Sequence, residues 1–214
     1  MSRFTMETKD KILARTGELF RMMGMKALTM DMIAADLGVS KRTIYEYFGD
    51  KETLMLAAFD YMIKENNKYL LEVAAESPNV IEAIFVITEI QHRRMVTSNP
   101  IIFDDLKRFF VRLNISYYSN REKCREFSVV YNLLERGKRE GIFREELKID
   151  VVDTFMMELV ILFHTSEALK NLKMTREEAI VNIFLPFFRG LCTVRGVELL
   201  DQYQPGAWSF HHHD

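Results

Sequence analysis

Residues 28–54 read LTMDMIAADLGVSKRTIYEYFGDKETL, and this stretch decides the fold. Thr29 is a typical N-cap residue in front of a short apolar run, which predicts a helix that Gly38 ends. Ser40 is the next N-cap residue, and the helix it begins reaches Phe48. The stretch therefore predicts two short helices separated by a tight turn.

These two helices carry the pattern of a helix-turn-helix. Ala34 is small enough to let the helices approach closely, Gly38 accepts a positive φ in the turn, and Val39 and Ile44 bury the inner face of the second helix. The outer face combines positive charge, hydroxyl groups and aromatic rings, which suit phosphates and base edges. It holds Lys41, Arg42, Thr43, Tyr45 and Tyr47. The pattern alone is equally typical of a solvated helix pair in a helical bundle.

Residues 28–54 resemble the signature of the TetR/AcrR family of bacterial regulators along almost their whole length. The resemblance covers about 50 residues at the N-terminus. It implies a homodimer, a recognition helix at residues 41–47 and an effector pocket among the C-terminal helices. Lys41, Arg42, Thr43 and Tyr45 match positions that contact bases or nearby phosphates in the family, and Thr29, Tyr47 and Lys51 match phosphate-contacting positions.

Two residues near this helix pair bear on DNA binding. Lys51 lies in the first turn of a helix that Asp50 caps, and the positive end of the helix dipole favours a phosphate there. Asp31 departs from those members that place a DNA-contacting basic residue at its position. Its carboxylate favours its own helix N-terminus but repels phosphate, so we expect no base contact from the first of the two helices.

The composition of the whole chain predicts an all-α protein. Among 214 residues there are only 9 glycines and 4 prolines, too few for a fold built from many tight turns. We expect about nine helices, arranged as an N-terminal three-helix helix-turn-helix domain and a C-terminal helical bundle. The predicted divisions are residues 1–52 for DNA binding, 53–200 for effector binding and dimerisation, and 201–214 as a tail.

The helices outside the motif follow from apolar periodicity and capping signals. We expect one helix at 6–23, a long one that Asp50 caps and that runs into the 70s, and helices that begin at Ser77-Pro78 and at Asn99-Pro100. The next helix contains Cys124, Phe127 and Leu134 and ends at Gly141, and a loop follows at 141–150. Asp150 caps another helix, and the last one opens with a Thr175–Glu178 capping box, is kinked at Pro186 and runs to Leu191. The last two, the eighth and ninth helices, are the most apolar. We expect them to pair across the two-fold axis of the homodimer.

An effector site is expected among the C-terminal helices, because two polar side chains interrupt an apolar helix face. Thr88 and His92 fall on the stripe that also contains Phe85. Phe110, Tyr131 and Phe163 lie on neighbouring predicted helices and complete the candidate pocket. This lining favours an apolar or aromatic effector, while Arg93-Arg94 leaves an anionic one open. A hydrogen-bonded core histidine is the commoner explanation of His92.

Other classes of protein are disfavoured by the sequence. It contains no GxGxxG, P-loop or HExxH motif, so we expect neither an enzyme nor a bound cofactor. Cys124 and Cys192 lack metal-ligand spacing, and consecutive side chains of the run 211–213 cannot converge on one metal ion. The net charge of the chain is −2, and residues 1–50 contain 8 Lys and Arg against 7 Asp and Glu. This balance excludes a basic protein that coats nucleic acid whatever its sequence, but it leaves room for a local basic patch.

The predicted function is therefore a DNA-binding repressor that a small molecule releases from a palindromic operator. No membrane span is expected, and the free cysteines favour the cytoplasm. The alternative is a helical dimerisation or adaptor protein that keeps the fold without specific DNA binding. Its support is the weak basicity of residues 1–50, and the intact outer face at residues 41–47 argues against it.

Overall fold

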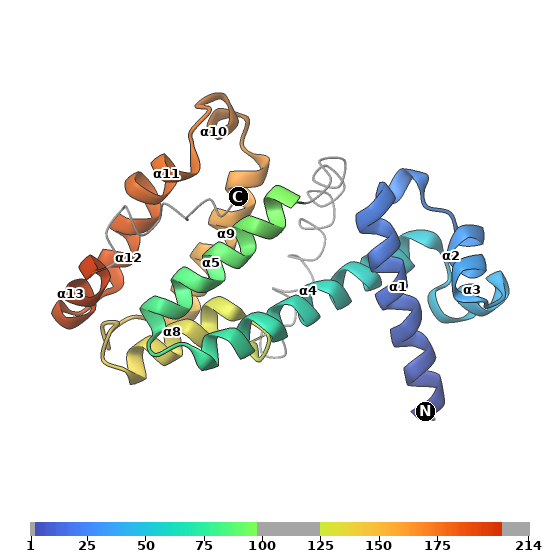
Figure 1. Ribbon diagram of the computed structural model, residues 1–214, viewed down its shortest axis with the longest axis horizontal. Helices are drawn as coiled ribbons and strands as arrows, with labels where there is room; N and C mark the ends of the chain where they lie inside the picture. Colours follow the sequence, from blue (N-terminus) through green and yellow to red (C-terminus); the bar gives the residue numbers. More distant parts are fainter. Residues whose placement is uncertain (1–2, 98–124, 203–214) are drawn as a thin grey trace, which may run out of the picture. The chain divides into compact units, whose positions relative to one another are not determined.

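The computed structural model describes residues 3–97 and 125–202. Within these two ranges every regular element is a helix, apart from an isolated antiparallel bridge between Phe143 and Cys192 (Figure 1). This confirms the all-α fold class. The described residues divide into two compact units: the first draws on 3–69, 91–97 and 125–127, and the second on 70–90 and 128–202.

The first unit contains α1 (Arg3–Ala27), α2 (Met30–Leu37), α3 (Lys41–Phe48) and most of α4 (Lys51–Glu76). Its core is made of apolar side chains from all four helices, including Ile12, Phe20, Ile33, Ile44, Phe48, Leu54 and Phe59. The predicted helix 6–23 is too short at both ends. Gly24 leaves helical geometry at φ 75° and ψ 167°, which is the interruption that the sequence indicated, but helical residues follow it as far as Ala27.

The predicted caps of the three following helices are confirmed. The Oγ1 atom of Thr29 accepts a hydrogen bond from the Met32 amide at 3.2 Å, and Gly38 adopts the left-handed conformation at φ 65°. Ser40 caps α3 in the same way, by accepting from the Thr43 amide at 3.0 Å. Asp50 Oδ1 accepts from the Thr53 amide at 2.7 Å at the start of α4.

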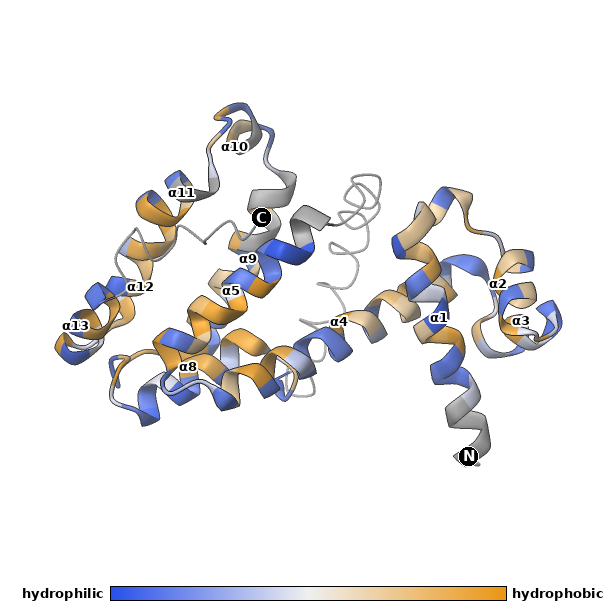
Figure 2. Cartoon of the chain, viewed as in Figure 1, coloured by the Kyte–Doolittle hydropathy of each residue, from blue (hydrophilic) through white to orange (hydrophobic). Residues whose placement is uncertain are grey.

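The second unit contains the end of α4 and most of α5, followed by a series of shorter helices. The helices are α5 (Val80–Thr97), α8 (Val129–Arg139), α9 (Ile149–Thr165), α10 (Glu167–Asn171), α11 (Arg176–Ala179), η1 (Ile180–Phe184), α12 (Leu185–Leu191) and α13 (Val194–Gln202). Its core includes Leu70, Val80, Ile81, Ile87, Leu134, Phe143 and Leu191. Hydrophobic residues dominate the first turns of α5 and hydrophilic ones its later turns (Figure 2).

Three predicted helix starts in this part of the chain are wrong. Ser77 does not cap a helix; its hydroxyl donates to the Val73 carbonyl, and Asn79 caps α5 by accepting from the Glu82 amide at 3.0 Å. The helix predicted to contain Cys124 and Phe127 begins only at Val129, after the cap Ser128. Asp150 lies in the first turn of α9, which begins at Ile149 with no side-chain cap. The first and third starts lie about two residues from the expected positions, within the ordinary variation of helix ends, whereas the second lies at least five residues later than expected.

The last predicted helix is interrupted rather than continuous. The Thr175–Glu178 capping box is confirmed, with reciprocal bonds of 2.8 and 3.2 Å. The regular α geometry then gives way to the π turn η1 before Pro186, so the distortion lies upstream of the proline, where a simple kink was expected. The loop after Gly141 is confirmed, whereas α10 and α13 were not predicted. The helix start predicted at Asn99-Pro100 lies outside the described residues.

Candidate nucleic-acid interface

The inner faces of α2 and α3 fix how the two helices are held. The Val39 amide donates to the Ala34 carbonyl at 3.0 Å, which closes the turn between them. Ile44 is fully buried and Ala34 nearly so, and Val39 packs against the same core. Because the inner face of α3 is buried, its opposite face is fixed toward solvent.

The outer face of α3 carries the side chains that the sequence predicted there. Lys41, Arg42 and Tyr45 are exposed, and Thr43 and Tyr47 are half-buried. Thr29, on the same helix pair, is exposed, although its hydroxyl caps α2. The Thr43 hydroxyl shares a hydrogen bond of 2.8 Å with that of Ser40. The Tyr47 ring lies 6.1 Å from that of Phe48.

Met32 is also exposed, although the sequence placed it in the apolar run of α2. It directly precedes the buried Ile33, and one helical residue corresponds to a rotation of about 100°. The helical spacing around Ile33 could therefore have revealed an exposed apolar side chain at this surface.

Both basic residues of α3 are held in ion pairs. Lys41 Nζ lies 2.8 Å from Asp31 Oδ2 of α2, and Arg42 Nε lies 2.9 Å from Glu46 Oε1 one turn along α3. The hydrogen bond to Asp31 is the main cause of a raised pKa at Lys41. The sequence singled out Lys41, Arg42 and Asp31, but it did not predict that Lys41 pairs with Asp31 or Arg42 with Glu46.

Lys51 contacts a backbone carbonyl near the end of α1. Its Nζ donates to the Met25 carbonyl at 2.8 Å, and the side chain is part-buried. Lys51 is the first residue of α4, as expected, while its ammonium group satisfies a carbonyl just beyond the break at Gly24. This second contact was not predicted.

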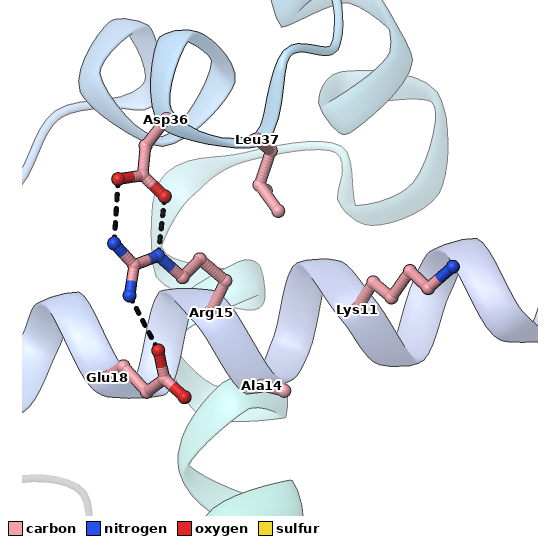
Figure 3. Close-up of a pocket in the computed structure, with 6 residues that line it drawn as sticks. All are labelled: Lys11, Ala14, Arg15, Glu18, Asp36 and Leu37. Carbon is pink, nitrogen blue, oxygen red and sulfur yellow. Dashed lines mark hydrogen bonds and ion pairs between the residues drawn. The ribbon is translucent and has the colours of Figure 1, made fainter.

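An arginine of α1 holds the last turn of α2 (Figure 3). Arg15 donates two hydrogen bonds to Asp36, at 2.5 and 2.8 Å, and one to Glu18 at 2.6 Å. The ion pair lies in a surface pocket that Lys11, Ala14 and Leu37 also line. These contacts fix α2, and with it the turn into α3, against α1.

The five residues predicted to hold an effector are not brought together by described contacts. Phe110 lies outside the described residues, as does the side chain of Phe163. The Thr88 hydroxyl donates to the Ile84 carbonyl of its own helix at 2.7 Å. His92 and Tyr131 are half-buried. A surface pocket in the second unit is lined by other residues, among them Asn79, Glu140 and Arg195.

Metal-binding side-chain clusters and membrane-crossing helices are both absent from the described ranges, residues 3–97 and 125–202. No group of three or more His, Cys, Asp or Glu side chains there could hold a metal ion. None of the described helices is long and apolar enough to cross a membrane. The thiol of Cys192 is free and buried, and burial raises its pKa to about 11. Cys124 lies outside the described residues.

The helix pair lies in a stretch of the chain that is similar to known bacterial regulators. Residues 12–58 match the model of bacterial regulatory proteins of the tetR family. The uncharacterized HTH-type transcriptional regulator YhgD of Bacillus subtilis is 33% identical over 97 residues, which cover 44% of this chain and 51% of that protein. This chain thus spans about half the length of that relative. The HTH-type transcriptional repressor KstR2 of Mycobacterium tuberculosis is 23% identical over 155 residues, or 69% of this chain and 75% of KstR2.

Solved structures share the fold. A TetR-family transcriptional regulator from Pectobacterium atrosepticum aligns over 90% of this chain and 98% of its own, with a TM-score of 0.60 and 19% identity. The transcriptional regulator FadR of Bacillus subtilis, solved in complex with stearoyl-CoA, aligns over 83% of this chain and 95% of its own, with a TM-score of 0.57 and 17% identity. At these identities the likeness establishes the fold alone.

Proposed function

We propose that this chain, whose residues 12–58 match the model of bacterial regulatory proteins of the tetR family, is a ligand-responsive transcriptional repressor that binds duplex DNA. The observation that carries the proposal is the outer face of α3. There the polar and aromatic side chains are presented to solvent by a helix whose opposite face, with Ile44 and Phe48, is buried. The relative KstR2 is described as a transcriptional repressor, which supports repression as the action of this chain.

The DNA contacts in this proposal divide into readers and clamps. Lys41, Arg42, Thr43 and Tyr45 read base edges in the major groove, because the N-terminal part of a recognition helix enters it. Thr29, Tyr47 and Lys51 hold the phosphates and fix the register of the helix on the duplex. Hydroxyl and ammonium groups suit this second role because they donate to phosphate oxygens whatever the base sequence.

A homodimer completes the proposal, with α9 and the α11–α12 segment as the interface. α9 presents Val151, Phe155 and Leu162 to solvent at helical spacing, and η1 presents Val181. Phe184, also on η1, is half-buried. A two-fold axis would place the two recognition helices about 34–36 Å apart, one turn of DNA, and so requires a palindromic operator. The exposed apolar stripe of α9 supports this pairing.

We propose further that a small apolar or aromatic molecule binds in the C-terminal helices and lowers the affinity for DNA. The stearoyl-CoA complex of FadR supports an effector with a long apolar part. Thr88, His92, Phe110, Tyr131 and Phe163 remain the proposed lining. Coupling of about 1–3 kcal/mol would change DNA affinity about 5- to 150-fold, and DNA must weaken effector binding by the same factor.

Selection of bound fragments from random duplex DNA, at stated salt concentrations, tests the proposed function. A regulator of this kind enriches a palindrome with half-sites about one helical turn apart. A chain that enriches no sequence at any salt concentration is instead the dimerisation or adaptor protein. Titration of fatty acyl thioesters into the selected complex then tests an effector with a long apolar part, and this form of the effector is wrong if none of them releases DNA.

A further inference from the structure

The ion pair between Lys41 and Asp31 lies where a recognition helix begins. Lys41 is the first residue of α3, and Asp31 lies in the first turn of α2, ten positions earlier in the chain. Both side chains remain open to solvent, so the ion pair is part of the surface that meets a ligand.

A carboxylate in this place opposes binding to DNA in general. Non-specific binding comes from cations that neutralise phosphates and release condensed counterions. Lys41 is already neutralised by Asp31, and moving its ammonium group to a phosphate would leave the carboxylate unpaired beside the DNA backbone. The same holds for Arg42 and Glu46, so α3 together with Asp31 carries no net charge.

Base edges present a different partner from phosphates. The major groove offers hydrogen-bond acceptors and donors next to one another, for example guanine O6 and cytosine N4 of one base pair. A neighbouring ammonium and carboxylate can satisfy such an arrangement without separating. An ion pair at the start of α3 thus favours particular sequences over the uniform backbone.

We infer that Asp31 is a specificity-determining residue, which restrains Lys41 and suppresses binding to DNA that lacks the operator sequence. This inference rests on the proposed function. It adds sequence selectivity to the simple expectation for an acidic residue at a DNA-binding surface, because removal of Asp31 should strengthen binding, but to the wrong DNA.

The test compares Asp31→Asn with wild type in the full-length chain. Each protein is titrated with a duplex selected by the wild type and with a scrambled duplex of equal length, between about 50 and 200 mM salt. The expected result is that Asp31→Asn binds the scrambled duplex about three- to tenfold more tightly, with a log–log salt slope steeper by about 0.9 per subunit. The ratio of selected to scrambled affinity falls accordingly.

Asp60→Asn is the matched control. Asp60 pairs with Lys64 at 2.6 Å in another exposed ion pair, on α4, nine residues beyond Lys51. Asp60→Asn changes the net charge by the same amount as Asp31→Asn. A general charge effect would therefore strengthen the binding of both variants to the scrambled duplex alike, and that result would overturn the inference. The inference also fails if Asp31→Asn keeps the wild-type affinity for scrambled DNA. A wild type that selects no duplex refutes the proposed function itself, before any variant is compared.

Discussion

Arg15 and Asp36 face each other across α1 and α2 with two hydrogen bonds, one from Nε to Oδ2 at 2.5 Å and one from Nη2 to Oδ1 at 2.8 Å. Asp36 lies two residues before Gly38, where the chain turns toward α3. A two-point contact restricts rotation more than a single hydrogen bond does. The position of α3 on the first unit is thus supported by an ion pair between α1 and α2.

The Arg15–Asp36 pair predicts a pH dependence of stability. The hydrogen bond from Arg15 lowers the pKa of Asp36. The ionised carboxylate therefore stabilises the fold fully above about pH 5, and this contribution is lost as the pH falls through the ordinary aspartate value of about 3.9 and below. Arg15→Met should flatten the acid limb of the unfolding free energy, measured by denaturant titration at each pH. An unchanged acid limb would show that the pair contributes nothing.

Lys51→Met should weaken binding to every duplex alike. The variant keeps the apolar stem but loses the ammonium group in the first turn of α4, where the helix dipole favours a phosphate. Fluorescence anisotropy should show a salt slope reduced by about 0.9 per subunit, with specificity retained. Lys51→Arg, which preserves the charge, should keep the slope. A loss confined to the selected sequence would make Lys51 a reader instead.

Tyr45→Ala should lower specificity rather than general affinity. The Tyr45 side chain is 42% exposed on the outer face of α3. Its loss should cost about 1–3 kcal/mol on the selected duplex and little on a scrambled one. Tyr69, 43% exposed on α4, supplies the control, and Tyr69→Ala should leave both affinities unchanged. Equal losses for the two tyrosine variants would count against the assignment of α3.

Phe155→Asp should dissociate the homodimer. The Phe155 ring is 49% exposed even though it packs on Phe187 at 5.3 Å, and a carboxylate at the centre of an apolar interface would be buried without a partner. Sedimentation equilibrium at micromolar concentration measures the result. Met22→Asp, at an exposed site on α1, is the control and should remain dimeric. A wild-type monomer would contradict the proposed interface.

Gly196→Ala should destabilise the second unit by about 1–3 kcal/mol. A Cβ atom at Gly196 would lie 2.2 Å from the Ile142 carbonyl oxygen, and backbone cannot yield as a flexible side chain does. Gly190→Ala, where nothing lies within 4 Å of the added Cβ, should instead stabilise the helix slightly. Chemical unfolding of the two variants should therefore change in opposite directions, and a stable Gly196→Ala would be inconsistent with this close approach.

The features that the sequence predicted correctly are local ones. Thr29, Gly38 and Ser40 act on backbone groups within a few residues, so the caps and the turn could be inferred from spacing alone. The exposed positions of Lys41 and Tyr45 followed from the same helical period. Predicted contacts with DNA and effector remain predictions.

The features that the sequence did not reveal depend on residues far apart in the chain. Arg15 meets Asp36 across 21 positions, and Lys51 reaches Met25 across 26. A charged residue on a solvated helix face has many possible partners, and periodicity does not select among them. The helix start near Ser77 failed for another reason, because Ser77 and Asn79 can both cap a helix and only Asn79 does. The start at Asp150 failed because α9 begins at Ile149 with no side-chain cap.

The π turn at Ile180–Phe184 also determines how this part of the chain tolerates a change of length. A π turn is closed by a bond from residue i to i+5, here from the Leu185 amide to the Ile180 carbonyl, and so holds one more residue than an α turn. Deleting one residue would let the backbone return to α geometry without losing a helical hydrogen bond. In both kinds of turn the donating amide lies over the accepting carbonyl, so the side chains of α12 would keep their angular phase and the Phe187 ring would keep its partner Phe155 on α9. The π turn thus makes room for one additional residue without changing the face that the end of the chain turns toward α9.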